Sequence, residues 1–153
     1  MGNVERILVA TDLTPKSEAA IRYGVDLARQ LNASVLVHHA MGTPELPVER
    51  LDHTGEGHTE SAQHDVEVHL AEHVATALGG PVPPHVEPVM TFGDPALEVA
   101  DLAVKRDCQL IVVTVANRSR VGKFLMGSNA RRIMVTASVP VVAVGPGWSP
   151  GTS

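Results

Sequence analysis

Aromatic residues and cysteine are scarce in this chain of 153 residues. Aromatic side chains make up 3% of the sequence, and the one cysteine is Cys108. A single cysteine excludes an intramolecular disulfide framework, and so few aromatics argue against a surface that stacks nucleic-acid bases. No apolar run approaches the ~18 residues that a membrane-spanning helix needs, and the first residues lack the basic start and cleavage site of a secretory signal. These absences favour a protein of the reducing cytoplasm without a membrane segment.

Positive charge is in the minority and unevenly placed. The formal net charge is −5, which argues against a general nucleic-acid binder. More than half of the 12 basic residues nevertheless fall between positions 105 and 132. We therefore expect a local positive field around that stretch.

Apolar residues make up 44% of the chain, enough for the core of one domain. Five short runs rich in β-branched residues predict strands at Arg6–Thr11, Ser34–His39, His85–Thr91, Gln109–Val115 and Val139–Val144. Several of these runs are apolar throughout rather than alternating, which is typical of parallel strands buried on both faces.

Helical patterns alternate with the strands. They cover Lys16–Leu31, Thr59–Leu78, Asp94–Arg106 and Ser128–Ala137, and Thr14-Pro15 is typical of an N-cap followed by a first helical position. The alternation predicts an α/β fold with a single open, doubly wound, five-stranded parallel sheet and helices on both faces. We expect one domain over residues 1–146 and a flexible C-terminal tail over 147–153, and we interpret Met41–His58 as a long loop.

The carboxyl edge of such a sheet is where ligands bind, at the point where the strand order reverses. Gly127-Ser128 opens a helix after the fourth strand, and Arg118, Arg120 and Lys123 lie just upstream. A helix start offers an anion its unpaired N–H groups and the positive end of its dipole. The pattern predicts a phosphate site; the alternative is that Ser128 is only an N-cap and the basic residues are solvated.

Four stretches of the sequence resemble the universal stress protein family. They are ILVATDLTPKSEAAI, VLVHHA, GDPALEVADLAVKRDCQLIVV and GKFLMGSNARRIMVTASVPVVAV, and the resemblance runs from about Glu5 to Val144. It implies a flavodoxin-like strand order, 3-2-1-4-5, and a homodimer formed through Val139–Val144. An uncovered apolar edge strand is a physical reason to expect pairing there.

ATP-binding members of that family share a loop of the form G-x2-G-x9-G-[ST]. Gly127 and Ser128 match its last pair, but Thr114 and Asn117 stand where the two earlier glycines would be. Asn tolerates the positive φ that glycine allows, whereas the β-branched Thr prefers extended backbone and occupies ligand space. The resemblance implies a nucleotide site made of Ala10, Thr11, Asp12, Ala40, Val113, Thr114, Asn117, Gly127, Ser128, Asn129 and Ala130. For Asp12, the alternative is an acid that only caps a turn.

Histidine is concentrated between positions 53 and 85, which hold six of the eight. His69, Glu72 and His73 match the H-x-x-E-H pattern of a zinc peptidase. That chemistry needs a third ligand and a substrate cleft, so we favour the interpretation that both rings border the helix's apolar stripe. Asp65, His69 and His73 remain the weak candidates for an adventitious metal. Cys108 precedes a buried strand and is interpreted as a core residue rather than a nucleophile.

Two functions therefore compete. In the first, a small cytoplasmic stress-response protein binds ATP or a related adenine nucleotide, with or without Mg, and with at most weak hydrolysis or autophosphorylation. In the second, the protein binds no nucleotide and acts through dimerisation and contacts with an unidentified protein partner. Neither function makes it an enzyme, requires a cofactor, or involves nucleic acid or a membrane. A metal-dependent enzyme that uses the histidine-bearing helix is a third, weaker hypothesis.

Overall fold

A computed structural model describes residues 2–42, 57–115 and 126–151, with only the helical backbone described for 57–61. The elements in chain order are β1 (Arg6–Ala10), a short 3-10 helix η1 (Pro15–Ser17), α1 (Glu18–Leu31), β2 (Ser34–Met41), α2 (Gly57–Leu78), β3 (Val86–Phe92), α3 (Pro95–Lys105), β4 (Leu110–Thr114), α4 (Ser128–Thr136) and β5 (Val141–Val144). The predicted strands and helices are all present, with ends that differ by one to a few residues. One detail was wrong: Thr14 caps η1 rather than α1, and its side chain makes no capping bond.

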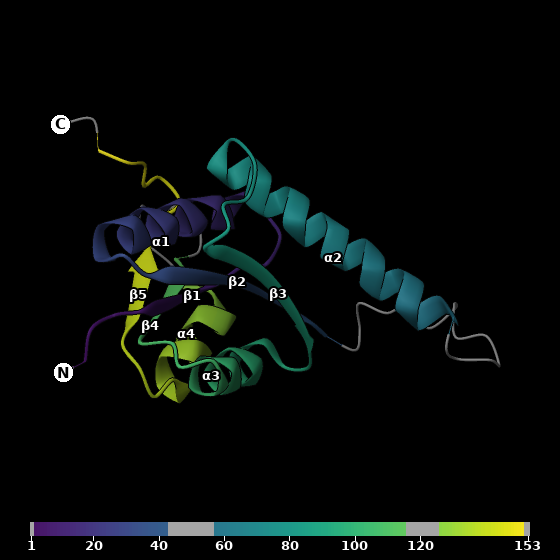
Figure 1. The fold of residues 1–153 in the computed structure, drawn as a ribbon. Helices are drawn as coiled ribbons and strands as arrows, with labels where there is room; N and C mark the ends of the chain where they lie inside the picture. The colour runs from purple at the N-terminus through teal and green to yellow at the C-terminus, as the bar shows by residue number, and fades with distance from the viewer. Residues whose placement is uncertain (1, 43–56, 116–125, 152–153) are drawn as a thin grey trace, which may run out of the picture.

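The five strands form one parallel sheet in the order β3-β2-β1-β4-β5 (Figure 1). β1 lies at the centre, where Leu8 pairs with Leu36 of β2 on one side and with Ile111 of β4 on the other. The expected α/β class and strand order are therefore confirmed. Because the strand order reverses between β1 and β4, the helices that follow these two strands leave toward opposite faces of the sheet.

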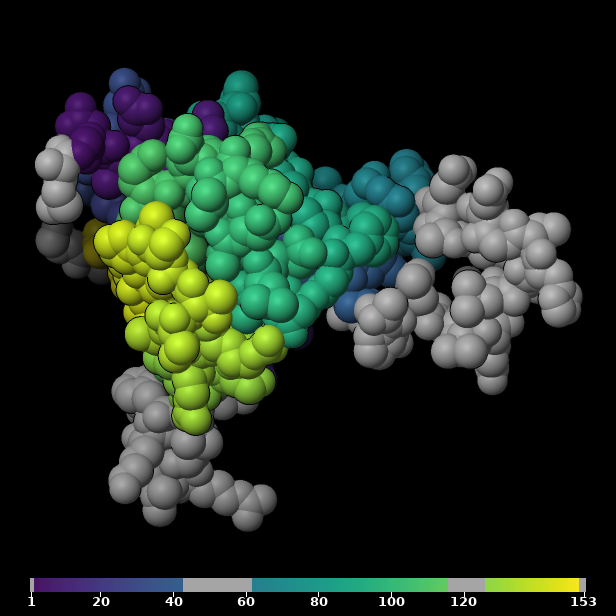
Figure 2. Space-filling model, turned by 90° about the horizontal axis from the view of Figure 1, so that it is seen from below, coloured from purple at the N-terminus to yellow at the C-terminus, as the bar shows by residue number. Residues whose placement is uncertain are grey.

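Each face of the sheet carries two helices, α1 and α2 on one side and α3 and α4 on the other (Figure 1). Successive residues of β1 point to opposite faces, so Ile7 and Val9 enter the core under α1 and α2 while Leu8 enters the core under α3 and α4. Figure 2 views the molecule from below, where α3 and α4 cover the sheet. All three β1 residues are fully buried, which explains why this strand is apolar throughout.

α2 packs on the sheet only in its C-terminal half. Leu70, His73, Val74 and Ala77 are buried at helical spacing, whereas Val68 and His69 are exposed. Toward its N-terminus the helix extends away from the sheet (Figure 1). None of the described helices is long and apolar enough to cross a membrane.

Beyond β5, the chain returns to the core at Trp148. Its ring meets Tyr23 of α1 edge-on, with the centroids 5.2 Å apart, and it packs against the same core as α1. The single tryptophan therefore reports on the packing of α1. Cys108 is 4% exposed and lies in the core under α3 and α4. Burial raises the pKa of its thiol, so it lacks the thiolate character of a nucleophile.

The close approach of α1 to β1 at Gly24 generates a stability prediction. A Cβ at Gly24 would overlap Cγ2 of Val9, which is fully buried. We expect Gly24→Ala to lower the free energy of unfolding by about 1–3 kcal/mol, the usual effect of overpacking a core. Urea denaturation followed by Trp148 fluorescence measures it.

The matched control is Gly80→Ala, where a Cβ meets nothing within 4 Å. This substitution should change stability by less than about 1 kcal/mol, and in the stabilising direction if at all. Equal effects of the two substitutions would contradict the proposed close packing.

Candidate functional site

A cavity of about 330 Å³ lies at the carboxyl edge of the sheet, where the ends of β1, β2 and β4 meet the first turns of α3 and α4. The nucleotide-site residues predicted from the sequence line it, apart from Asn117, which lies outside the described residues. They are Ala10, Thr11, Asp12, Ala40, Val113, Thr114, Gly127, Ser128, Asn129 and Ala130. The fold thus brings together residues from both ends of the sequence at one opening.

Several lining residues were not predicted: Lys16, Ser17, His38, His39, Pro95, Val99 and Ile133. For some of these residues, the sequence contains information that could have identified them. His38 lies two residues before Ala40 on the same strand and pairs with Ala10 of β1, so strand periodicity places its side chain on the same face as Ala40. Lys16 and Ser17 follow Asp12 by only a few residues, in the turn that leads from β1 into α1.

The N-terminus of α4 lines the cavity, and its first N–H groups have no partner within the helix. Gly127 is the N-cap residue and contributes no side-chain capping bond, and the first helical bond runs from the Arg131 N–H to the Gly127 carbonyl. The N–H groups of Ser128, Asn129 and Ala130 therefore have no partner within the helix. Ser128 is the first helical residue, so the N-cap position belongs to Gly127 rather than to Ser128.

Asp12 caps the turn after β1 and also lines the cavity. Its Oδ1 accepts hydrogen bonds from the Thr14 N–H (2.9 Å), the Thr14 hydroxyl (2.6 Å) and the Ser17 hydroxyl (3.1 Å). Partial burial by itself would raise the pKa of Asp12, but these hydrogen bonds outweigh it and hold the pKa below its usual value. The carboxylate is ionised at neutral pH, so it suits a hydroxyl or amine donor on a ligand and repels a phosphate.

Thr114 ends β4 at the cavity wall. Its Oγ1 is buried and has no hydrogen-bond partner among the residues that the structure describes. A buried hydroxyl without a partner costs free energy, so a native structure that keeps one calls for an explanation. The position is the one where the family's ATP-binding loop would have its first glycine.

Two adjacent histidines of β2 are held on opposite faces of the sheet. The His38 Nε2 lies 2.7 Å from the Thr91 hydroxyl, and His39 donates its Nδ1–H to the Thr11 carbonyl at 3.0 Å. His38 is 1% exposed, and burial, with a smaller contribution from the charge of His39, lowers its pKa to about 4. The His38 ring is therefore neutral at pH 7.

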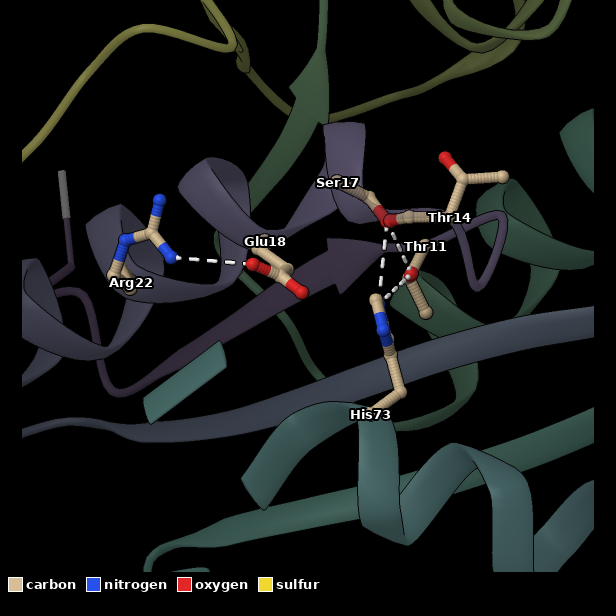
Figure 3. A network of polar contacts seen from close by, with 6 residues as sticks. All are labelled: Thr11, Thr14, Ser17, Glu18, Arg22 and His73. Atoms are coloured by element: carbon tan, nitrogen blue, oxygen red, sulfur yellow. Dashed lines mark hydrogen bonds and ion pairs between the residues drawn. The ribbon is translucent and has the colours of Figure 1, made fainter. Parts of the chain in front are cut away.

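His73 faces the core rather than bordering it. Its Nε2 lies 2.8 Å from the Thr11 hydroxyl and 3.3 Å from the Ser17 hydroxyl (Figure 3). His69 and Asp65, by contrast, are exposed. Within the described residues no group of three or more His, Cys, Asp or Glu side chains could hold a metal ion, so the weak metal candidates do not converge.

The basic residues near the C-terminus do not form one field around the cavity. Lys105 and Arg106 pair with Asp101 (2.7 Å) and Glu87 (2.6 Å), and the carbonyl of Arg106 accepts a bond from Arg6 at the start of β1. They therefore lie at the opposite edge of the sheet. The expectation of a single positive field is wrong for these two residues, while Arg118, Arg120 and Lys123 lie outside the described residues.

Arg132 is also engaged. Its guanidinium binds both carboxylate oxygens of Asp94, at 2.8 and 2.9 Å, and so joins α4 to the start of α3. Among the residues that the structure describes, Lys16 is the basic residue that lines the cavity, as Asp12 also does.

The sequence and the fold were both compared with those of known proteins. The sequence profile of the "Universal stress protein family" matches residues 3–145. A universal stress protein of Mycolicibacterium smegmatis is 30% identical over 141 residues, which cover 92% of this chain and 97% of that protein. A solved universal stress protein in complex with cAMP has a TM-score of 0.67 at 19% identity, covering 95% of this chain and 99% of that one. One from Archaeoglobus fulgidus in complex with dAMP has a TM-score of 0.59 at 20% identity, covering 93% and 98%.

The buried neutral histidines generate a pH prediction. The pKa of His38 falls from 6.5 to about 4 on folding, so stability is complete above pH 6.5 and is lost as pH falls toward 4. A shift of this size corresponds to about 3 kcal/mol. The pKa of His73 is lowered too, mainly by burial, and acts in the same direction.

Urea denaturation between pH 7 and pH 4 tests this prediction. His38→Gln, which keeps a polar group near Thr91 and does not titrate, should remove most of the His38 share of the loss. His64→Gln, at an exposed position of α2, is the control and should leave the pH dependence unchanged. A wild-type profile that is flat over this range would contradict the burial of neutral imidazoles.

Proposed function

The chain belongs to the universal stress protein family, and we propose that the cavity at its carboxyl edge binds an adenine nucleotide. The supporting observation is that the cavity is lined by the predicted residues and borders a helix start whose N–H groups have no partner within the helix. The cAMP and dAMP complexes of proteins with this fold support the same ligand class. A volume of about 330 Å³ lies at the small end of ligand sites. A mononucleotide is therefore the better-sized ligand.

The chemistry of the lining residues favours one orientation of a nucleotide in the cavity. The first turn of α4 offers backbone donors and a positive dipole end, which suit the phosphate. Asp12 offers a carboxylate oxygen to the ribose hydroxyls. Ala10, Ala40 and Val99 supply apolar surface for the base.

Calorimetry with AMP, ATP and cAMP, with and without Mg, tests the proposal. We expect AMP to bind with a dissociation constant at or below about 1 mM, equivalent to about 4 kcal/mol. Adenosine should bind roughly tenfold more weakly or worse, because it lacks the charge-assisted bonds to α4. Absence of both heat and a thermal shift at that concentration would leave the alternative, a stress protein that acts through protein contacts.

Ser128→Pro isolates the contribution of the helix start. Proline is tolerated at the first helical position, and Gly127 already has the extended backbone that precedes proline (ψ 153°). The substitution removes one N–H and the hydroxyl, whereas Ser128→Ala removes only the hydroxyl. We expect the proline variant to weaken AMP binding more than the alanine variant does and to leave adenosine binding unchanged. Equal losses of affinity for AMP and adenosine would place the phosphate elsewhere.

Two substitutions separate the effect of the volume of Thr114 from the effect of its hydroxyl. Thr114→Gly opens space at the cavity wall and should strengthen AMP binding. Thr114→Val keeps the shape and removes the unpartnered hydroxyl, so it should leave affinity unchanged and raise stability by about 1 kcal/mol. Loss of AMP binding in both variants would mean that the hydroxyl contacts the ligand.

β5 supports a second proposal, that the chain forms a homodimer through this edge strand. Ile111 and Val115 donate to the carbonyls of Pro140 and Val144, so the even-numbered residues bond to β4. Val141 and Ala143 consequently present their N–H and C=O groups to the open edge. At the other edge of the sheet, β3 contains Pro88, which cannot donate a bond. Of the two edges, β5 is therefore the better template for a second copy of the chain.

Ala143→Glu tests the homodimer proposal, because it places like charges near each other across a two-fold strand pair. We expect size-exclusion chromatography with light scattering to shift from dimer toward monomer. Val104→Glu is the control, since Val104 is 63% exposed on α3. A wild-type monomer, or identical behaviour of the two variants, would overturn the proposed interface.

A further inference from the structure

The turn between β1 and α1 forms one wall of the cavity and is conformationally strained. Thr11, Asp12, Lys16 and Ser17 all line the cavity, and between them Leu13 has a φ of +65°. A bulky L-residue adopts that left-handed conformation only at a cost in free energy. Such a residue persists where its surroundings hold it in place.

Side chains within the turn and from η1 hold its conformation. The Leu13 N–H donates to the Thr11 hydroxyl at 3.1 Å, and the Thr11 and Ser17 oxygens lie 2.7 Å apart. Ser17 in turn reaches Asp12 Oδ1 and the Thr14 carbonyl. The orientation of the Asp12 carboxylate thus depends on the same hydroxyl groups that hold the strained residue.

His73 supplies the contact to this group from outside the turn. It comes from α2, more than 50 residues further along the chain, and its Nε2 contacts both hydroxyls (Figure 3). Burial lowers the pKa of His73 and outweighs the opposing influence of Glu18 and Asp12, so the ring is neutral at pH 7. A neutral ring with its proton on Nδ1 accepts the Thr11 O–H at Nε2, while Thr11 accepts the Leu13 N–H.

We propose that His73 is a positioning residue through which α2 holds the Thr11–Ser17 wall of the cavity. It is not among the residues that line the cavity, so its effect on a ligand passes through Thr11, Ser17 and Asp12. The effect on affinity rests on the nucleotide site proposed above, whereas the effect on the wall does not.

The pair of Ser17 and His73 does not act as a nucleophile and its base. Ser17 is 2% exposed, and its hydroxyl already lies within bonding distance of the Thr14 carbonyl at 2.8 Å. Although Ser17 belongs to the cavity lining, its hydroxyl is engaged by Thr11, Asp12 and the Thr14 carbonyl rather than directed at a ligand. Ser17 and His73 therefore have a structural role, and any effect on function comes from the position that they give to the cavity wall.

Amide hydrogen exchange in the ligand-free protein tests the role of His73. The reporters are the N–H groups of Leu13 and Thr14, which bond to Thr11 and Asp12. We expect His73→Leu to speed their exchange about three- to tenfold, the loss that one net hydrogen bond predicts. His73→Gln, whose amide reaches about as far as Nε2, should restore most of the protection.

Val74→Ala is the matched control. Val74 is fully buried next to His73 on α2, and its truncation weakens the packing of the helix without touching the hydroxyl groups. Turn amides exchange by local opening, so Leu13 and Thr14 should keep near-wild-type rates in this variant. Unchanged rates in His73→Leu, or the same acceleration in Val74→Ala, would overturn the proposal.

AMP titration of the same variants separates this inference from the proposed function. If AMP binds the wild type, His73→Leu should weaken AMP binding by a factor similar to its effect on amide exchange, and His73→Gln should restore the affinity. If AMP binds all variants equally, His73 does not position the site, although the nucleotide proposal stands. If AMP binds none of them, the nucleotide proposal fails, and the exchange rates of Leu13 and Thr14 alone decide whether His73 holds the turn.

Discussion

Parallel pairing of β1 with both β2 and β4 determines where the helices and the cavity of this fold lie. It brings the carboxyl ends of these strands to one edge and sends the following chain to opposite faces of the sheet. The cavity lies where those two directions diverge, so Asp12 and Ser128, far apart in sequence, line the same space. The fully buried apolar strands maintain this geometry, because a register shift of one residue would turn core side chains to the wrong face.

The two sides of the cavity differ in how they are stabilised. On one side, α4 is fastened to α3 by the ion pair of Arg132 with Asp94, the residue that also caps α3. On the other side, a strained turn is held by hydroxyl groups and an imidazole from α2. The start of α4, whose first N–H groups have no partner within the helix, therefore lies across the cavity from a turn held by hydrogen bonds. Through His73, that turn is connected to α2, a helix whose N-terminal half lies clear of the sheet (Figure 1).

The sequence predicts the fold well and the site in outline. The apolar runs around Ile7–Val9 and Ile111–Val113 identify buried parallel strands, because only side chains covered on both faces can be apolar at successive positions. The candidate site residues were predicted from the resemblance to the universal stress protein family, and those that the structure describes line one cavity. What could not be predicted depends on contacts between distant elements. The spacing of His73 from the apolar residues of α2 places it on the buried face of that helix. The neighbouring sequence, however, does not show that its ring contacts Thr11 and Ser17.

Charge along the sequence was a poor guide to charge in space. Lys105 and Arg106 precede the predicted phosphate loop by few residues, yet α3 runs opposite to the strands and carries them to the far edge of the sheet. Lys16, which the count of basic residues did not single out, lines the cavity instead.

The most direct measurement of the central claim is a ¹H–¹⁵N NMR titration with AMP, compared with adenosine. AMP should move the amide signals of Ser128, Asn129 and Ala130 together with those of Thr11 and Asp12. Adenosine should affect mainly the β1 and β2 ends of the cavity. Shifts around Lys105 and Arg106, or none at the start of α4, would contradict the claim that the carboxyl-edge cavity binds a nucleotide by its phosphate.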